Sequence, residues 1–132
     1  MIIMQAPRSG PTLLRQRMTK SSWNANSSAW TIVPSWTSDP SHPATIVSHK
    51  LIVQGSGVAV VSATATRTNL TSEVRILRNG AVIGSGTLSS ATPVYTFSQS
   101  MAVAEGDQIW MEIAAASTVR TITNMAIDVT PA

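Results

Sequence analysis

The sequence predicts an all-β fold, a β-sandwich, from three observations. From residue 29 onward, short runs of Val, Ile, Thr and Ala alternate with Gly, Pro and Asn, which is typical of strands joined by turns. Asn79 and Gly80 separate two of these runs and form the residue pair that a two-residue hairpin turn prefers. No segment after residue 28 has the length and period of a long helix. Many short strands at this spacing favour two packed antiparallel sheets.

Charge divides the chain into two parts. A length of 132 residues suits one compact domain with a tail. Residues 1–38 contain four cations and no acid, whereas residues 39–132 contain five basic and six acidic residues and sum to −1. We therefore expect an extended N-terminal arm over residues 1–28 and the sandwich over residues 29–132. A short helix over residues 11–20 is an alternative for part of the arm.

The expected strands follow one another in chain order. They cover residues 29–33, 44–54, 58–66, 72–78, 81–87, 93–100, 108–115 and 118–129, with a break in the last one near Asn124. The strands before and after Asn79-Gly80 form the clearest hairpin. Gly106 lies where the chain must reverse before the strand 108–115, in which apolar and polar residues alternate.

Two strands indicate a contact between subunits. The strand 58–66 places small side chains on one face, among them Ala59, Val61 and Ala63, and small residues allow close approach of another surface. Trp110 stands among polar neighbours on its strand, and tryptophan is enriched where area is buried between chains. We expect these four residues at an oligomer interface. The alternative for Trp110 is a solitary or loop-covered aromatic side chain.

Composition excludes several classes of function. Charged residues make up 11% of the chain, against roughly 25% in ordinary soluble domains, while Ser and Thr number 34, so the polar surface must consist of hydroxyl groups. The chain has no cysteine, no apolar run near the ~18 residues that cross a bilayer, and no secretory signal at its start. Four cations spread over the first 20 residues make only a modest patch for nucleic acid. We expect neither a membrane nor a nucleic acid as partner.

The residues that catalysis requires do not form a recognisable set. His42 and His49 are the only imidazole bases, and neither lies in a known motif. Asp39, Ser41 and His42 lie close together in sequence, but two prolines stiffen that segment into an extended turn. Their spacing also matches no metal motif, and the glycine-rich segments 55–57 and 84–86 lack the lysine and helix of a phosphate-binding loop. The sequence therefore predicts a protein that is not an enzyme and has no cofactor or metal.

The segment from His49 to the end of the chain resembles the trimeric jelly-roll domains of the complement globular-head and tumour-necrosis-factor-like class, especially versions found in virion proteins of tailed bacteriophages. The resemblance is carried by residues 57–63, by residues 74–83 around Asn79-Gly80, and by residues 101–109 with their Gly106-Asp107 turn. It implies that the sandwich is a jelly roll and that the protein is a homotrimer.

The segment from Trp30 to Trp36, followed by residues 39–43, is also similar to structural proteins of actinobacteriophages. That similarity implies a virion structural protein, namely a capsid decoration or cement protein assembled in the host cytoplasm. A minor tail protein of the same class is one alternative. Another is a module that binds carbohydrate or a host surface, with Trp23, Trp30 and Trp36 as candidate aromatic platforms.

The arm is the expected anchor on the particle. Its cations have no acid nearby in the sequence, and apolar residues stand between them, so it suits docking on an acidic partner such as the major capsid protein or another virion protein. The residues expected to make this contact are Arg8, Leu13, Leu14, Arg15, Arg17, Lys20 and Trp23.

Overall fold

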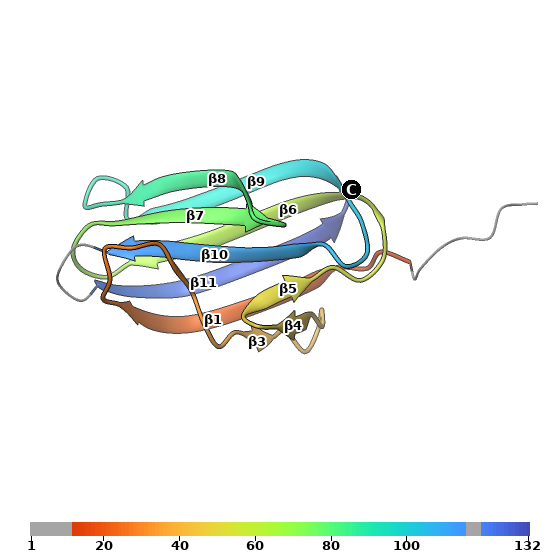
Figure 1. The fold of residues 1–132 in the computed structure, drawn as a ribbon, viewed down its shortest axis with the longest axis horizontal. Helices are drawn as coiled ribbons and strands as arrows, with labels where there is room; N and C mark the ends of the chain where they lie inside the picture. Colours follow the sequence, from red (N-terminus) through yellow and green to blue (C-terminus); the bar gives the residue numbers. More distant parts are fainter. Residues whose placement is uncertain (1–11, 116–119) are drawn as a thin grey trace, which may run out of the picture.

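The computed structural model describes residues 12–115 and 120–132, which form two antiparallel β-sheets packed face to face (Figure 1). The first sheet has the strand order β3 (Thr37–Ser38), β1 (Gln16–Ala25), β11 (Arg120–Pro131), β6 (Gly57–Arg67) and β9 (Val94–Val103). The second has the order β4 (Thr45–Val47), β5 (Lys50–Ile52), β10 (Gln108–Ala115), β7 (Ser72–Arg78) and β8 (Ala81–Leu88), and β2 (Thr31–Ile32) pairs with β10. The predicted all-β sandwich is confirmed. Within the described ranges, no helix is long and apolar enough to cross a membrane.

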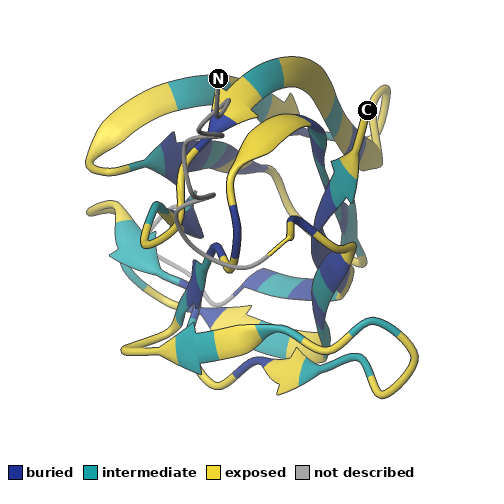
Figure 2. Cartoon of the chain, turned by 90° about the vertical axis from the view of Figure 1, so that its right-hand side faces the viewer, coloured by how far each residue is buried: buried dark blue, intermediate teal, exposed yellow. Residues whose placement is uncertain are grey.

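The core lies between the two sheets because apolar residues alternate along the strands (Figure 2). In β6 the alternate residues Ala59, Val61 and Ala63 are at most 4% exposed, and in β10 the residues Ile109 and Met111 are completely buried. The short side chains of β6 thus share one core with the longer side chains of β10.

Strand β1 lies inside the first sheet, hydrogen-bonded to β11 along nearly its whole length and to β3 on its other side. Met18 is fully buried, and Ala25 is 1% exposed. The predicted arm over residues 1–28 is therefore wrong for residues 12–28, and the helix considered for residues 11–20 is replaced by a strand from residue 16. Burial of Met18 and Ala25, together with backbone pairing on both sides, favours the strand over a free segment.

Two hairpin turns differ in whether the local sequence predicts them. Asn79 and Gly80 both have positive φ and join β7 to β8, as predicted. Ser48 and His49 also have positive φ, at 50° and 67°, and divide the expected strand 44–54 into β4 and β5. No glycine marks this second turn. Asn124 has positive φ where the register between β11 and β6 shifts, so a β-bulge stands where a break was predicted, and β11 itself runs unbroken from Arg120 to Pro131.

The hairpin turn after β7 is bound to the turn before β10. Arg78 Nη2 donates to Asp107 Oδ2 at 2.8 Å, and Asn79 Nδ2 donates to Asp107 Oδ1 at 3.0 Å. The backbone amide of Ala104 donates to Asp107 Oδ2 at 2.9 Å, while the amide of Gln108 donates to Asn79 Oδ1 at 2.8 Å. We call these contacts the turn lock. The two sequence signals of this region, Asn79-Gly80 and Gly106-Asp107, are thus parts of one structure.

Two glycines of β8 allow the aromatic residues of β9 to close one side of the sandwich. A Cβ atom at Gly84 would lie 2.4 Å from Phe97 Cδ1, and a Cβ atom at Gly86 would lie 2.6 Å from Tyr95 Cδ1. Both glycines lie within a strand that pairs with β7. Their role is to admit the two rings, since any side chain there would occupy the same space.

Candidate interaction surface

The outer side of the first sheet is covered by short hydroxyl side chains. In the middle of β6 and β9, the outward positions carry Ser or Thr and are partly or fully exposed, while the exposed Val58 and Val94 stand at the ends of these strands. We call this surface the hydroxyl face. It comprises Ser62, Thr64 and Thr66 of β6, Thr96, Ser98 and Ser100 of β9, Thr19 of β1 and Thr130 of β11.

The strand register arranges these residues in rows across the sheet. Asp128 is paired with Ser62, which is paired with Ser98 on the next strand. In the neighbouring row, Ala126 is paired with Thr64, and Thr64 with Thr96. Side chains in such cross-strand positions lie close to one another, so the face is a continuous surface of short groups.

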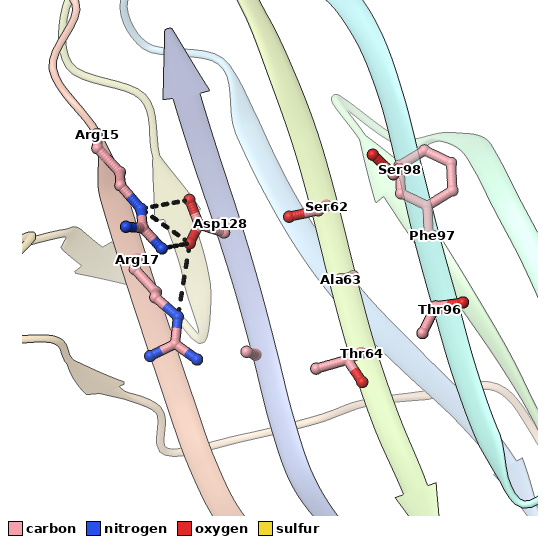
Figure 3. A pocket seen from close by; sticks show the side chains of 10 residues that line it. Arg15, Arg17, Ser62, Ala63, Thr64, Thr96, Phe97, Ser98 and Asp128 are labelled. Carbon is pink, nitrogen blue, oxygen red and sulfur yellow. Dashed lines mark hydrogen bonds and ion pairs between the residues drawn. The ribbon is translucent and has the colours of Figure 1, made fainter.

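A cluster of charges lies at the β1 side of the hydroxyl face (Figure 3). Arg15 Nη2 donates to Asp128 Oδ2 at 2.7 Å, and Arg17 Nε lies 3.5 Å from the same oxygen. Arg17 Nη1 also donates to Asp39 Oδ2 at 3.1 Å. The hydrogen bonds to Asp128 and its negative charge raise the pKa of the Arg15 guanidinium above its ordinary value. Two cations and two carboxylates thus neutralise each other within one chain.

A shallow depression of about 390 Å³ joins this cluster to the hydroxyl rows (Figure 3). Arg15, Arg17 and Asp128 stand on one side, and side chains from β6 and β9 stand on the other, including Ser62, Thr64 and Ser98. Because the depression is open and its groups are short, it suits contact with another surface rather than enclosure of a small substrate.

The polar groups beside the hydroxyl face are hydrogen-bonded to one another. His42 Nε2 lies 3.1 Å from Arg15 Nη1, so this ring nitrogen meets a donor. Asp39 Oδ1 accepts from the amide of Ser41, and this hydrogen bond, together with that from Arg17, holds the pKa of Asp39 below its ordinary value. Among residues 12–115 and 120–132, no group of three His, Cys, Asp or Glu residues could hold a metal ion.

The structure separates the residues that the sequence assigned to the arm. Arg8 lies outside the described residues. Leu13 is buried in the core, whereas Leu14 is 68% exposed. Trp23 packs against the core from β1, and Lys20 Nζ donates to the carbonyl oxygen of Ser35 at 3.2 Å. Arg15 and Arg17 are paired with acids of this chain, so these residues belong to the folded sandwich and not to a free arm, and their contact with a partner stays a prediction.

The four residues predicted at an oligomer interface are buried within the chain. Ala59, Val61 and Ala63 face the second sheet, because they belong to the hydrophobic core. Trp110 is 8% exposed, its Nε1 donates to Glu112 Oε2 at 2.8 Å, and Lys50 Nζ lies 4.4 Å from the centre of its ring. The prediction of these residues as interface is therefore wrong for the described chain, since a second subunit cannot reach them.

Sequence reasoning missed the other face of the same strand. Ser62, Thr64 and Thr66 alternate with the alanines and valine that drew attention to β6. The signal was present in the composition, because the large number of Ser and Thr residues required a surface of hydroxyl groups. Asp128 could not be assigned to Arg15 from the sequence, because the two residues are 113 positions apart.

Solved structures with the same fold define the class. The globular domain of zebrafish complement 1qA superposes with a TM-score of 0.62 at 13% identity, covering 89% of this chain and 96% of that one. Eiger TNF from S. frugiperda gives a TM-score of 0.60 at 16% identity, covering 92% and 94%. The fold is therefore a jelly-roll sandwich like those of complement 1q and tumour-necrosis-factor proteins. No family model and no curated protein matches the sequence.

Proposed function

We propose that this protein is a non-enzymatic structural protein that associates with copies of itself, as a homotrimer, through the hydroxyl face. The observation that carries the proposal is a broad outer face built of short Ser, Thr and Ala side chains with its charges already paired. Short side chains lose little conformational freedom when another surface covers them.

The charge cluster favours burial of this face. Asp128 has an 11% exposed side chain and accepts hydrogen bonds from Arg15 and from Thr130 Oγ1, the latter at 2.8 Å. A carboxylate that is already held by a guanidinium and a hydroxyl loses little solvation when a second subunit arrives. The hydroxyl groups of Ser62 and Ser98 can then donate and accept across the contact.

We further propose that the assembled protein is part of a virus particle, as a capsid decoration protein of a tailed bacteriophage, and is assembled in the host cytoplasm. The support is the resemblance of residues 30–36, 39–43, 57–63, 74–83 and 101–109 to virion proteins, together with a charge-poor surface of hydroxyl groups. Attachment to the particle is assigned to the chain before Thr12, whose sequence contains Ile2, Ile3 and Arg8.

Self-association is tested by sedimentation of the whole chain. We expect a trimer at micromolar concentration, and we expect Thr64→Glu to give a monomer because three buried carboxylates would repel one another. Thr45→Glu, which changes an exposed residue of β4 in the second sheet, is the matched control and should remain trimeric. A wild-type monomer, or a trimer that tolerates Thr64→Glu, would refute the proposal.

Attachment is tested by adding labelled protein to virus particles that lack this protein. Wild-type protein should bind capsids at saturating occupancy, and a variant that lacks residues 1–11 should remain trimeric without binding. Label found on tails would reassign the protein to the tail. Normal occupancy by the shortened variant would move the attachment site to the sandwich itself.

A further inference from the structure

A chain of contacts crosses the outer side of the second sheet and ends at an exposed tryptophan. Glu112 Oε2 accepts from Trp110 Nε1, and Glu112 Oε1 accepts from Arg75 Nη2 at 2.6 Å and from Arg75 Nε at 2.9 Å. The Arg75 guanidinium carbon lies 4.3 Å from the centre of the Trp30 ring. Lys50 lies over Trp110 at the other end of the chain of contacts. This arrangement holds the Trp30 ring in place before any ligand arrives.

Trp30 is the tryptophan that is most open to solvent. It is 37% exposed, whereas Trp110 and Trp36 are each 8% exposed and Trp23 packs against the core. Trp36 also donates from Nε1 to the carbonyl oxygen of Val33 at 2.8 Å. Of the three tryptophans considered as aromatic platforms, only Trp30 therefore presents enough ring surface for that role.

A depression of about 160 Å³ lies beside Trp30, between this ring and strand β8. Glu73 of β7 and Ser85 and Thr87 of β8 line it. The register pairs Glu73 with Thr87 and Arg75 with Ser85, so a carboxylate and two hydroxyl groups stand next to the ring. The side chains of Glu73, Ser85 and Thr87 are exposed, whereas Arg75, whose guanidinium group stacks on the indole, is half-buried.

We propose that Trp30 and this depression bind a single sugar residue of a saccharide. The C–H face of a pyranose stacks on the exposed indole, while its hydroxyl groups donate to the Glu73 carboxylate and exchange hydrogen bonds with Ser85 and Thr87. One aromatic ring with a polar rim suits a ring-sized ligand that has one apolar face. A protein partner would require a wider apolar surface than Trp30 provides.

This site is independent of the proposed assembly, because it lies on the opposite sheet from the hydroxyl face. A trimer that buries the first sheet leaves Trp30 pointing outward. A protein that fails to self-associate would therefore still have the saccharide site. Likewise, a protein that binds no saccharide could still self-associate through the hydroxyl face.

The test is a nuclear magnetic resonance titration of the whole chain, which follows the indole N–H signal of Trp30. The probes are the methyl glycosides of glucose, galactose, mannose and N-acetylglucosamine, and a trisaccharide of each. We expect a saturable shift with at least one sugar, with a dissociation constant on the order of 1 mM because one ring buries little area. The largest shift should fall on Trp30, whose signal is identified with Trp30→Phe.

Four variants decide the outcome. Trp30→Ala should weaken binding at least about tenfold, while Trp30→Phe should retain part of it because a ring is still present. Glu73→Gln should weaken binding severalfold, and Val82→Ala, which changes an exposed apolar residue of β8, should have no effect. A thermal unfolding curve for each variant separates loss of binding from loss of fold. No saturable shift with any probe, or binding that Trp30→Ala leaves unchanged, would overturn the proposal.

Discussion

Asp107 is a residue whose single side chain holds two turns together. It accepts hydrogen bonds from Arg78, from Asn79 and from the amide of Ala104. Replacement by Asn puts an amide group where one carboxylate oxygen accepted, so at least one donor loses its partner. We expect Asp107→Asn to lower the free energy of unfolding by about 1 to 3 kcal/mol.

Urea denaturation followed by tryptophan fluorescence measures this change. Glu105→Gln is the control, because Glu105 is an exposed residue of the same turn whose side chain has no hydrogen bond among the described contacts. An equal loss in both variants would mean that the charge of the turn, and not the turn lock, stabilises the fold.

Gly86 is required by its neighbour rather than by its own backbone angles. A Cβ atom there would lie 2.6 Å from Tyr95 Cδ1, and Tyr95 is 9% exposed with core residues around it. The tyrosine ring cannot move without opening the side of the sandwich. We expect Gly86→Ala to destabilise the protein by about 1 to 3 kcal/mol, as crowding of a packed core does.

Thermal unfolding of Gly86→Ala, compared with Ser85→Ala, tests this expectation. Ser85 is exposed on the same strand, so its truncation removes no core contact. Equal midpoints for the two variants would show that Tyr95 can be displaced at little cost.

Strand β1 contributes to the fold as a whole element. It lies between β3 and β11, and its removal would expose the backbone of β11 and the core residues that Met18 and Ala25 cover. We expect a chain that lacks residues 1–11 to fold, and a chain that lacks residues 1–24 to be unfolded or aggregated. Circular dichroism and size-exclusion chromatography of the two shortened proteins measure the difference. A compact β-rich protein without residues 1–24 would mean that β1 is dispensable.

The strands differ in how well local sequence could predict them. The strands 72–78 and 108–115 have the predicted bounds, because apolar alternation and a glycine turn both mark them. Strand β1 was missed because Ser21, Ser22 and Asn24 resemble a loop, although β11 supplies hydrogen-bond partners for that stretch. The division of β4 from β5 was also missed, because Ser48 and His49 reach positive φ without a glycine.

The hydroxyl face depends on pairing between strands, which the sequence of one strand alone does not predict. The position of Ser62 and Thr64 on a strand was predicted, but their alignment with Asp128 and Thr96 is set by the strand order β11-β6-β9. In the same way, Trp110 stands on the polar side of its strand, as predicted, and the contact with Lys50 that covers it depends on pairing between β10 and β5. The pairing of the strands therefore decided which of the residues on the outer faces are exposed to solvent and which are covered.

Two carboxylates, one serving each sheet, connect the stability of the fold to pH. Burial raises the pKa of Asp107, but its hydrogen bonds from Ala104, Asn79 and Arg78 together bring the pKa below its ordinary value. The pKa of Asp39 is also lowered, by hydrogen bonds from Ser41 and Arg17. A carboxylate whose pKa is lower in the folded than in the unfolded chain stabilises the fold above the unfolded pKa of about 3.9.

We therefore expect the midpoint of thermal unfolding to be steady from about pH 7 to 5 and to fall as the pH drops through about 4 and below, where both groups become protonated. Scanning calorimetry at several pH values measures this profile. Asp39 serves the first sheet through Arg17, and Asp107 serves the second through the turn lock. A double variant with Asn at both positions should show a flatter profile, and a profile unchanged by these substitutions would assign the acid sensitivity to other groups.

The place of β11 in the sheet also determines when the protein can fold during its synthesis. Strand β11 lies between β1 and β6, and these two strands have no direct pairing with each other. During synthesis, β1 and β6 therefore wait for a neighbour that follows both of them in the sequence. The first sheet can close only after residues 120–131 have left the ribosome, so its formation requires pairing between segments that are far apart in the sequence. During that interval the edges of β1 and β6 are exposed, and a chaperone that binds extended apolar segments would find its target there.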